Sequence, residues 1–210
     1  MRDRGRSMKY RSRHDDTSLR DGNERGHVAQ VAARLILDHG LSDWGVAKRK
    51  AARQLMLPDR ITLPGDDEVE AALIEHQSLF GGPAHAEMLR DKRELALTWM
   101  RRLDRFAPVL VGGVAVGWAG EHNDVRIELT ADESKAVEIL LVDNGVHYRV
   151  VSDNGADGRA ELAIETPRGN VRLILRTPND VRQRPRRDRH GREPARLGID
   201  ALNALLNAAE

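Results

Sequence analysis

In the first half of the chain, apolar residues recur every three or four positions, the spacing of one face of an α-helix. Four stretches of this kind follow one another between residues 27 and 106. Residues 1–26 show no such spacing, and we expect them to form a disordered basic tail. Glycine and proline residues separate the four stretches, at Gly40, Pro58, Pro64 and Gly81-Gly82-Pro83. The pattern therefore predicts a helical domain over residues 27–106.

The spacing changes at Pro108, after which apolar and polar residues alternate as they do along β-strands. The expected strands are 109–111, 124–130, and segments around 147–151, 159–166 and 170–176. A helix is expected on either side of the second strand. The fold class is therefore α+β, in which the N-terminal helical segment precedes a small mixed-sheet α/β domain over 107–181. An irregular arginine-rich segment over 182–196 and a C-terminal helix over 197–210 complete the chain.

Cysteine is absent from the sequence, which excludes disulfide bonds, cysteine-ligated zinc, iron–sulfur clusters and thiol catalysis. No apolar run approaches the ~20 residues that span a bilayer, and the N-terminus lacks the apolar segment of a signal peptide. The phosphate-loop motif of P-loop ATPases and the G-x-S-x-G elbow of serine hydrolases do not occur. We therefore expect a soluble cytoplasmic protein without a membrane partner.

The formal net charge of +1 hides a segregation of charge along the chain. Residues 1–26 hold eight Lys and Arg residues against five acidic ones, and residues 182–196 hold seven arginines against two acidic ones, so residues 27–181 are acidic. Basic flanks favour polyanionic partners, here a nucleic acid or an acidic protein. The alternative is that both flanks are solvated and serve only solubility. The arginines expected to contact a polyanion are Arg184, Arg186, Arg187 and Arg189.

A Gly-Gly turn followed by a strand with acidic residues is the most informative chemical motif. The turn is Gly112-Gly113, and the strand that follows begins with Asp124. Glycines let a backbone approach a triphosphate closely, and the N-terminus of a following helix offers it amide groups. Two carboxylates two residues apart on a strand face the same side and can share Mg²⁺. The two glycines are therefore candidate nucleotide-binding residues, and Asp124 is the candidate catalytic residue.

This motif resembles the signature of the nucleotidyltransferase fold, an hG[GS] turn followed by a Dh[DE]h strand. The matching residues are Val111-Gly112-Gly113 and Asp124-Val125-Arg126-Ile127-Glu128-Leu129. Over roughly residues 27–210, the chain also resembles a proteobacterial group of uncharacterised nucleotidyltransferase-like proteins. The segments that carry this second likeness include Ala32-Ala33-Arg34-Leu35, Ala47-Lys48-Arg49-Lys50-Ala51-Ala52, Glu68-Val69-Glu70-Ala71-Ala72-Leu73 and His122-Asn123-Asp124-Val125. The resemblance implies a mixed-sheet domain and, for an active member, Mg²⁺-dependent nucleotidyl transfer.

The sequence departs from this signature at the second carboxylate, where Arg126 stands. An arginine cannot bind Mg²⁺, and its fixed positive charge repels the ion while attracting a nucleotide or another anion. Glu128 cannot take over, because four residues along a strand separate it from Asp124 by about 13 Å. If the protein is active, the expected metal ligands are Asp124 with Glu161 or Glu165 from a later strand.

Three functions therefore remain open. The favoured interpretation is a catalytically degenerate nucleotidyltransferase-fold protein that binds a nucleotide or another anionic partner, with Arg126 among its binding residues. The second is an active Mg²⁺-dependent nucleotidyltransferase with an atypical site. The third is a nucleic-acid or protein interaction module that uses residues 182–196. Mg²⁺ is the cofactor indicated, and only for the active enzyme.

Overall fold

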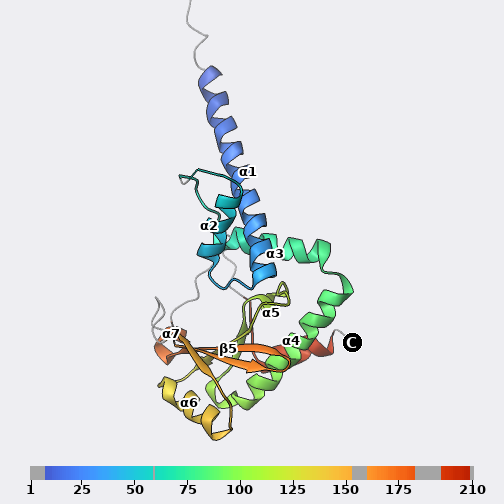
Figure 1. The fold of residues 1–210 in the computed structure, drawn as a ribbon, viewed down its shortest axis with the longest axis vertical. Helices are drawn as coiled ribbons and strands as arrows, with labels where there is room; N and C mark the ends of the chain where they lie inside the picture. The colour runs from blue at the N-terminus through green and yellow to red at the C-terminus, as the bar shows by residue number, and fades with distance from the viewer. Residues whose placement is uncertain (1–7, 59, 153–159, 183–194, 209–210) are drawn as a thin grey trace, which may run out of the picture. The chain divides into compact units, whose positions relative to one another are not determined.

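The computed structural model describes residues 8–58, 60–152, 160–182 and 195–208 (Figure 1). The chain divides into two compact units, Met1–Phe80 and Gly81–Glu210. The first unit is helical, and the second contains a β-sheet with helices packed against it. None of the described helices has the length and apolar composition needed to cross a membrane.

The helical unit is built from α1 (Met8–His39), α2 (Trp44–Gln54) and α3 (Asp66–Phe80). The start of α2 is fixed by Asp43, whose side chain accepts a hydrogen bond of 2.9 Å from the backbone N–H of Val46. The apolar stripes of the three helices supply the buried side chains Val28, Ala32, Ile36, Ala47, Ala51, Val69 and Leu73. Ion pairs reinforce this packing, with Arg25 on α1 at 2.6 Å from Glu68 on α3.

α1 begins at Met8, whereas the sequence led us to expect no regular structure before residue 27. Residues 8–26 contain no proline, the residue that disfavours a helix most strongly. Once a helix is nucleated by packing further along the chain, each added residue gains one backbone hydrogen bond. The helix therefore extends beyond its packed part. Apolar spacing detects only the buried stripe from Val28 to Leu37, which is why it missed the beginning of α1.

The second unit has the α+β architecture that the alternation of apolar residues predicted. Its helices and strands, in chain order, are α4 (Gly82–Arg102), a 3-10 turn (Asp104–Phe106), β1 (Val109–Val111), α5 (Gly113–Val116), β2 (Val125–Thr130), α6 (Ser134–Asp143), β3 (Arg149–Ser152), β4 (Glu161–Thr166), β5 (Gly169–Arg176), α7 (Pro178–Arg182), β6 (Arg196–Leu197) and α8 (Ile199–Asn207). The strand expected over 124–130 is confirmed as β2. The fold class is thus confirmed as α+β.

Within the described residues, six strands form one mixed sheet in the order β3-β4-β5-β2-β1-β6. The neighbours β2 and β5 are parallel, and the other neighbouring strands are antiparallel. One face of the sheet is apolar and carries side chains such as Leu110, Ile127, Leu162 and Leu173. These side chains join one core with residues of α4, α6 and α8. The helices therefore cover the apolar face of the sheet.

α4 belongs with the sheet, whereas the sequence led us to place it in a helical domain ending at residue 106. Leu95, Trp99 and Leu103 of this segment lie in the same core as the strands of the sheet. Apolar spacing predicts that a helix has a face to bury, but it does not say which element covers that face. The boundary between the two units consequently falls between Phe80 and Gly81, where Gly82 adopts a φ of 61°.

The arginine-rich segment expected to be irregular over 182–196 is described only at its ends. Arg182 closes α7, and Arg196 pairs with β1 as part of β6, so both ends lie in regular structure. The polyanion-binding candidates lie outside the described residues; they are Arg184, Arg186, Arg187 and Arg189. The final helix, α8, begins at Ile199, two residues later than expected.

Candidate functional site

The polar face of the sheet carries a set of oppositely charged side chains. Along β2 and β5, residues alternate between the buried apolar face and this opposite face, as the period of a strand requires. Arg126 and Arg172 are neighbours across the parallel pair β2 and β5. We call the following seven side chains the ionic face: Asp124, Arg126, Glu128, Glu161, Arg172, Arg176 and Arg196.

Arg172 contacts the candidate catalytic residue directly. Its Nε and Nη2 groups donate to Oδ2 of Asp124 at 3.2 and 2.8 Å, and its Nη1 group donates to Oε2 of Glu161 at 3.2 Å. The three side chains are largely buried, with 18 to 23% of each exposed. Burial alone would lower the pKa of Arg172, but the hydrogen bonds and charges of the two carboxylates outweigh it, so the pKa is raised. One guanidinium therefore holds both carboxylates.

Arg126 has a more exposed side chain than Arg172, the arginine that contacts both carboxylates. Its side chain is 34% exposed, and its Nη2 lies 3.6 Å from Oε1 of Glu161, too far for a hydrogen bond. Burial is the main reason that its pKa is lowered, and the charge of Glu161 partly opposes this effect. Arg126 lies two residues from Asp124 on the same strand, a spacing that would let its guanidinium reach that carboxylate or a phosphate. In the structure the carboxylate of Asp124 pairs with Arg172 on the neighbouring strand.

Glu128 forms a second cluster further along β2. Its side chain is only 7% exposed, and it pairs with Arg176 of β5 and, at 2.5 Å, with Arg196 of β6. Burial opposes its ionisation, but the hydrogen bonds and charges of the two arginines outweigh burial and lower the pKa of Glu128. Because β6 is only two residues long, this ion pair also fastens the edge of the sheet.

The Gly-Gly turn lies at the end of β1, beside Arg126. Gly112 has a φ of 71°, a conformation that favours glycine, and a Cβ at this position would lie 3.6 Å from Cδ of Arg126. A Cβ at Gly113 would lie 2.7 Å from the ring of Trp118. Gly113 is therefore required by the packing of that tryptophan, a structural role that the sequence did not reveal. The turn remains next to the candidate anion-binding arginine.

The loop before β2 is held by a lysine that the sequence did not single out. Nζ of Lys92, on α4, donates to the backbone oxygens of Glu121 and Asn123 at 2.9 and 2.7 Å. Burial lowers the pKa of Lys92, while the nearby charge of Asp124 opposes this shift. Lys92 thus fixes the backbone from which Asp124 projects and adds positive charge beside it.

The carboxylates proposed as metal ligands do not form a metal site. Among the described residues, no three His, Cys, Asp or Glu side chains are grouped closely enough to hold a metal ion. Arg172 stands between Asp124 and Glu161, and Glu165 is exposed four residues further along β4, about 13 Å from Glu161. Mg²⁺ binds through oxygen ligands at about 2.0–2.1 Å. The side chains present here therefore do not fit the ion.

A cavity of about 410 Å³ lies between α4 and α6, away from the ionic face. Its lining includes Trp99, Leu103 and Leu141, which belong to the core on the apolar side of the sheet. Arg102 lies over the ring of Trp99, 5.3 Å from its centroid. The cavity is therefore separate from the candidate site.

The chain matches no protein-family profile and no curated protein. Among the solved structures that match it is that of the Cid1 poly(U) polymerase with bound MgGTP, at 14% sequence identity and a TM-score of 0.33. The match covers 45% of this chain and 33% of the polymerase, so this chain accounts for about a third of that protein's length. The comparisons do not place the chain in the proteobacterial group that its motifs resemble. A likeness at this level carries no conclusion about function.

Proposed function

We propose that this is a nucleotidyltransferase-like protein that binds a nucleotide, or another phosphate-bearing anion, on the ionic face without transferring a nucleotidyl group. The observation that carries the proposal is the double contact of Arg172 with Asp124 and Glu161. One guanidinium donates hydrogen bonds to both carboxylates and stands between them, which leaves them unsuited to hold a metal ion. The positive charge of Arg126 remains beside the Gly-Gly turn and favours an anion there.

Arg126 is the side chain best placed to bind this anion. Its guanidinium is partly exposed and makes no hydrogen bond with Glu161, so its donors are available to a ligand. A guanidinium presents five N–H groups in a planar fork that matches the oxygens of a phosphate. Its lowered pKa does not change its charge at neutral pH, because arginine ionises only in strong base.

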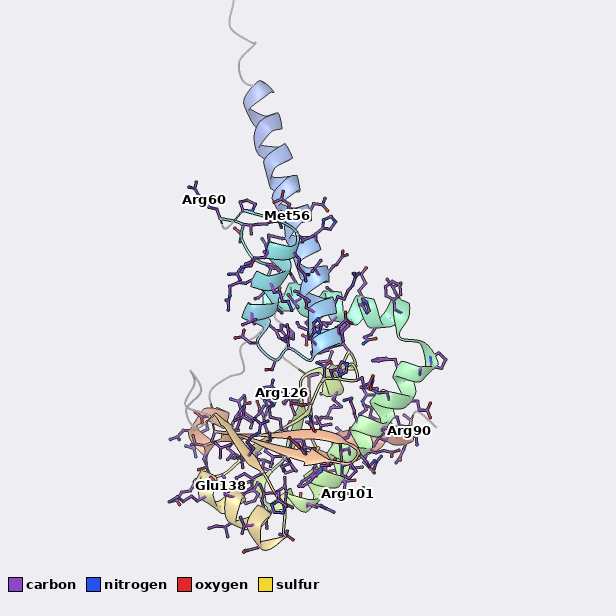
Figure 2. The ribbon with its side chains drawn as sticks, viewed as in Figure 1. Met56, Arg60, Arg90, Arg101, Arg126 and Glu138 are labelled. Atoms are coloured by element: carbon purple, nitrogen blue, oxygen red, sulfur yellow. The ribbon has the colours of Figure 1, made fainter. Side chains whose placement is uncertain are left out.

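Binding can be tested by isothermal titration calorimetry with ATP and with pyrophosphate. Arg126→Ala is expected to weaken binding by at least about tenfold, the effect of losing one hydrogen bond to a charged group. The matched control is Arg101→Ala, which removes an exposed arginine on α4 that hydrogen-bonds Oδ1 of Asn203. Figure 2 shows Arg126 and Arg101 on opposite sides of the sheet. An equal loss in both variants would indicate nonspecific attraction and contradict the proposal.

The absence of transfer needs its own test. The purified protein is incubated with labelled nucleoside triphosphates, Mg²⁺ and RNA or protein acceptors, and we expect no incorporation above a heat-inactivated sample. Incorporation that Asp124→Asn abolishes would contradict the proposal and favour an active enzyme with an atypical site.

A further inference from the structure

The nucleotidyltransferase resemblance implies a divalent cation next to Asp124, and the ionic face holds a different cation at that place. Three N–H groups of Arg172 bridge Asp124 and Glu161, at distances of 2.8 to 3.2 Å. A metal ion in a two-carboxylate site joins its ligands in the same way. We propose that the guanidinium of Arg172 substitutes for the divalent cation, so that the ionic face binds its phosphate-bearing ligand in metal-free form.

The local charges favour this arrangement over a metal complex. Arg126 lies 3.6 Å from Glu161, so two guanidinium groups already face the two carboxylates. Lys92 adds a third positive group close to Asp124. A divalent cation brought into this cluster would meet like charges on several sides, with both acidic partners already engaged. The cluster has no net negative charge left to bind a metal.

The hydrogen-bonding capacity of Arg172 indicates what the ligand contributes. A guanidinium has five N–H groups, and within the described residues Arg172 uses three of them on Asp124 and Glu161. The remaining N–H groups, together with those of Arg126, are suited to the oxygens of a phosphate or pyrophosphate group. Mg²⁺ occupies such oxygens in a metal–nucleotide complex, so the metal-free ligand fits the site better. This conclusion about the ligand rests on the proposed function, whereas the substitution of Arg172 for a divalent metal ion does not.

The substitution of Arg172 for a divalent metal ion is tested without any nucleotide, by measuring Mn²⁺ binding with electron paramagnetic resonance. The unchanged protein is expected to leave Mn²⁺ free, and Arg172→Ala is expected to bind it through Asp124 and Glu161. The matched control is Arg176→Ala on the same face of β5, which leaves Glu128 paired with Arg196 and is expected to gain no site. Adding Asp124→Asn to Arg172→Ala should abolish the gain. Mn²⁺ binding on this face of the unchanged protein, or no gain in a folded Arg172→Ala variant, would overturn the proposal.

The preference for metal-free ligand is tested on the unchanged protein, so it does not depend on whether a variant folds. Pyrophosphate is titrated calorimetrically in EDTA and again in saturating Mg²⁺, and the affinity is expected to fall by about tenfold or more with the metal. Tighter binding in Mg²⁺ would overturn this inference and leave the proposed function standing. No binding under either condition would overturn the proposed function, and the Mn²⁺ result alone would then decide whether Arg172 substitutes for a divalent metal ion.

Discussion

Glu128 is a charged side chain that the sheet buries and still keeps ionised. Arg176 and Arg196 contact it from two different strands, and its pKa is lowered despite its burial. Replacing one member of a buried ion pair leaves the partner charge without compensation and costs about 3–5 kcal/mol. Because both arginines are partly exposed, we expect Glu128→Gln to lower the free energy of unfolding by about 3 kcal/mol at pH 7. Urea unfolding measures this loss.

The lowered pKa of Glu128 also sets the direction of a pH effect. The stability that the ionised carboxylate contributes is complete above the ordinary glutamate pKa of about 4.3 and is lost as the pH falls through the lower pKa of the folded state. The difference in free energy of unfolding between the unchanged protein and Glu128→Gln should therefore become smaller on acidification below about pH 4.3. Glu133→Gln, at an exposed position, should change stability by less than about 0.5 kcal/mol. A difference in free energy of unfolding that stays constant with pH would contradict a stabilising role for the ionised carboxylate of Glu128.

Gly113 is constrained by packing against Trp118. A Cβ at this position would lie 2.7 Å from the ring, and the tryptophan is 5% exposed and cannot move aside freely. We expect Gly113→Ala to destabilise the protein by about 1–3 kcal/mol, the range for overpacking a core. In a Trp118→Leu background, the same substitution should cost much less, and a double-mutant cycle measures this coupling. Equal costs in both backgrounds would show that the ring is not the cause.

At the scale of elements, α1 is longer than the stripe of apolar residues that packs it. Gly22 and Gly26 lie within the helix, and a Cβ at either position would meet nothing within 4 Å. Alanine loses less conformational entropy than glycine in a helix, so each Gly→Ala change should stabilise α1 by about 0.5–1 kcal/mol. Circular dichroism at rising temperature measures the effect. A loss of helical signal in the Gly22→Ala, Gly26→Ala double variant would contradict a helix that runs through both residues.

The sequence predicted the strands of the sheet better than the partners of the helices. β2 places its apolar residues Val125, Ile127 and Leu129 at every second position, and this period can be read from residue types alone. The start of α1 left no apolar signal, and the packing of α4 on the sheet depends on contacts between distant parts of the chain. The local sequence pattern therefore predicts whether a segment is a helix or a strand. The length of α1 and the packing of α4 on the sheet depend on tertiary contacts that this pattern does not contain.

At the scale of the whole molecule, the core of the second unit runs from Leu89 on α4 to Leu206 on α8. A fragment of residues 81–210 contains all of this core, whereas a fragment of residues 107–210 lacks the α4 side chains. Burying one large apolar side chain contributes about 1.5–3 kcal/mol, and the whole stability of a domain is about 5–15 kcal/mol. We therefore expect cooperative urea unfolding for the longer fragment and none for the shorter one. Cooperative unfolding of the shorter fragment would contradict the boundary at residue 81.

The candidate site was only partly predictable for the same physical reason. Asp124, Arg126 and Gly112 lie near one another in the chain, and their grouping follows from a turn and a strand. Arg172 lies 48 residues beyond Asp124 and reaches it only because β2 and β5 pair in parallel with Arg126 beside Arg172. Its position in an alternating strand indicated that it faces away from the core. No local pattern indicated which strand would lie beside it.

The contact between Arg172 and Asp124 also bears on how sequences of this kind diverge. Once an arginine faces the aspartate, losing the aspartate would leave a largely buried cation with one partner fewer, so folding alone favours keeping the acid. The two positions are then retained as a pair, and metal binding at these carboxylates requires Arg172 to change. Where such an arginine faces it, an aspartate at this point of the strand is explained by folding alone and is not by itself evidence of metal binding.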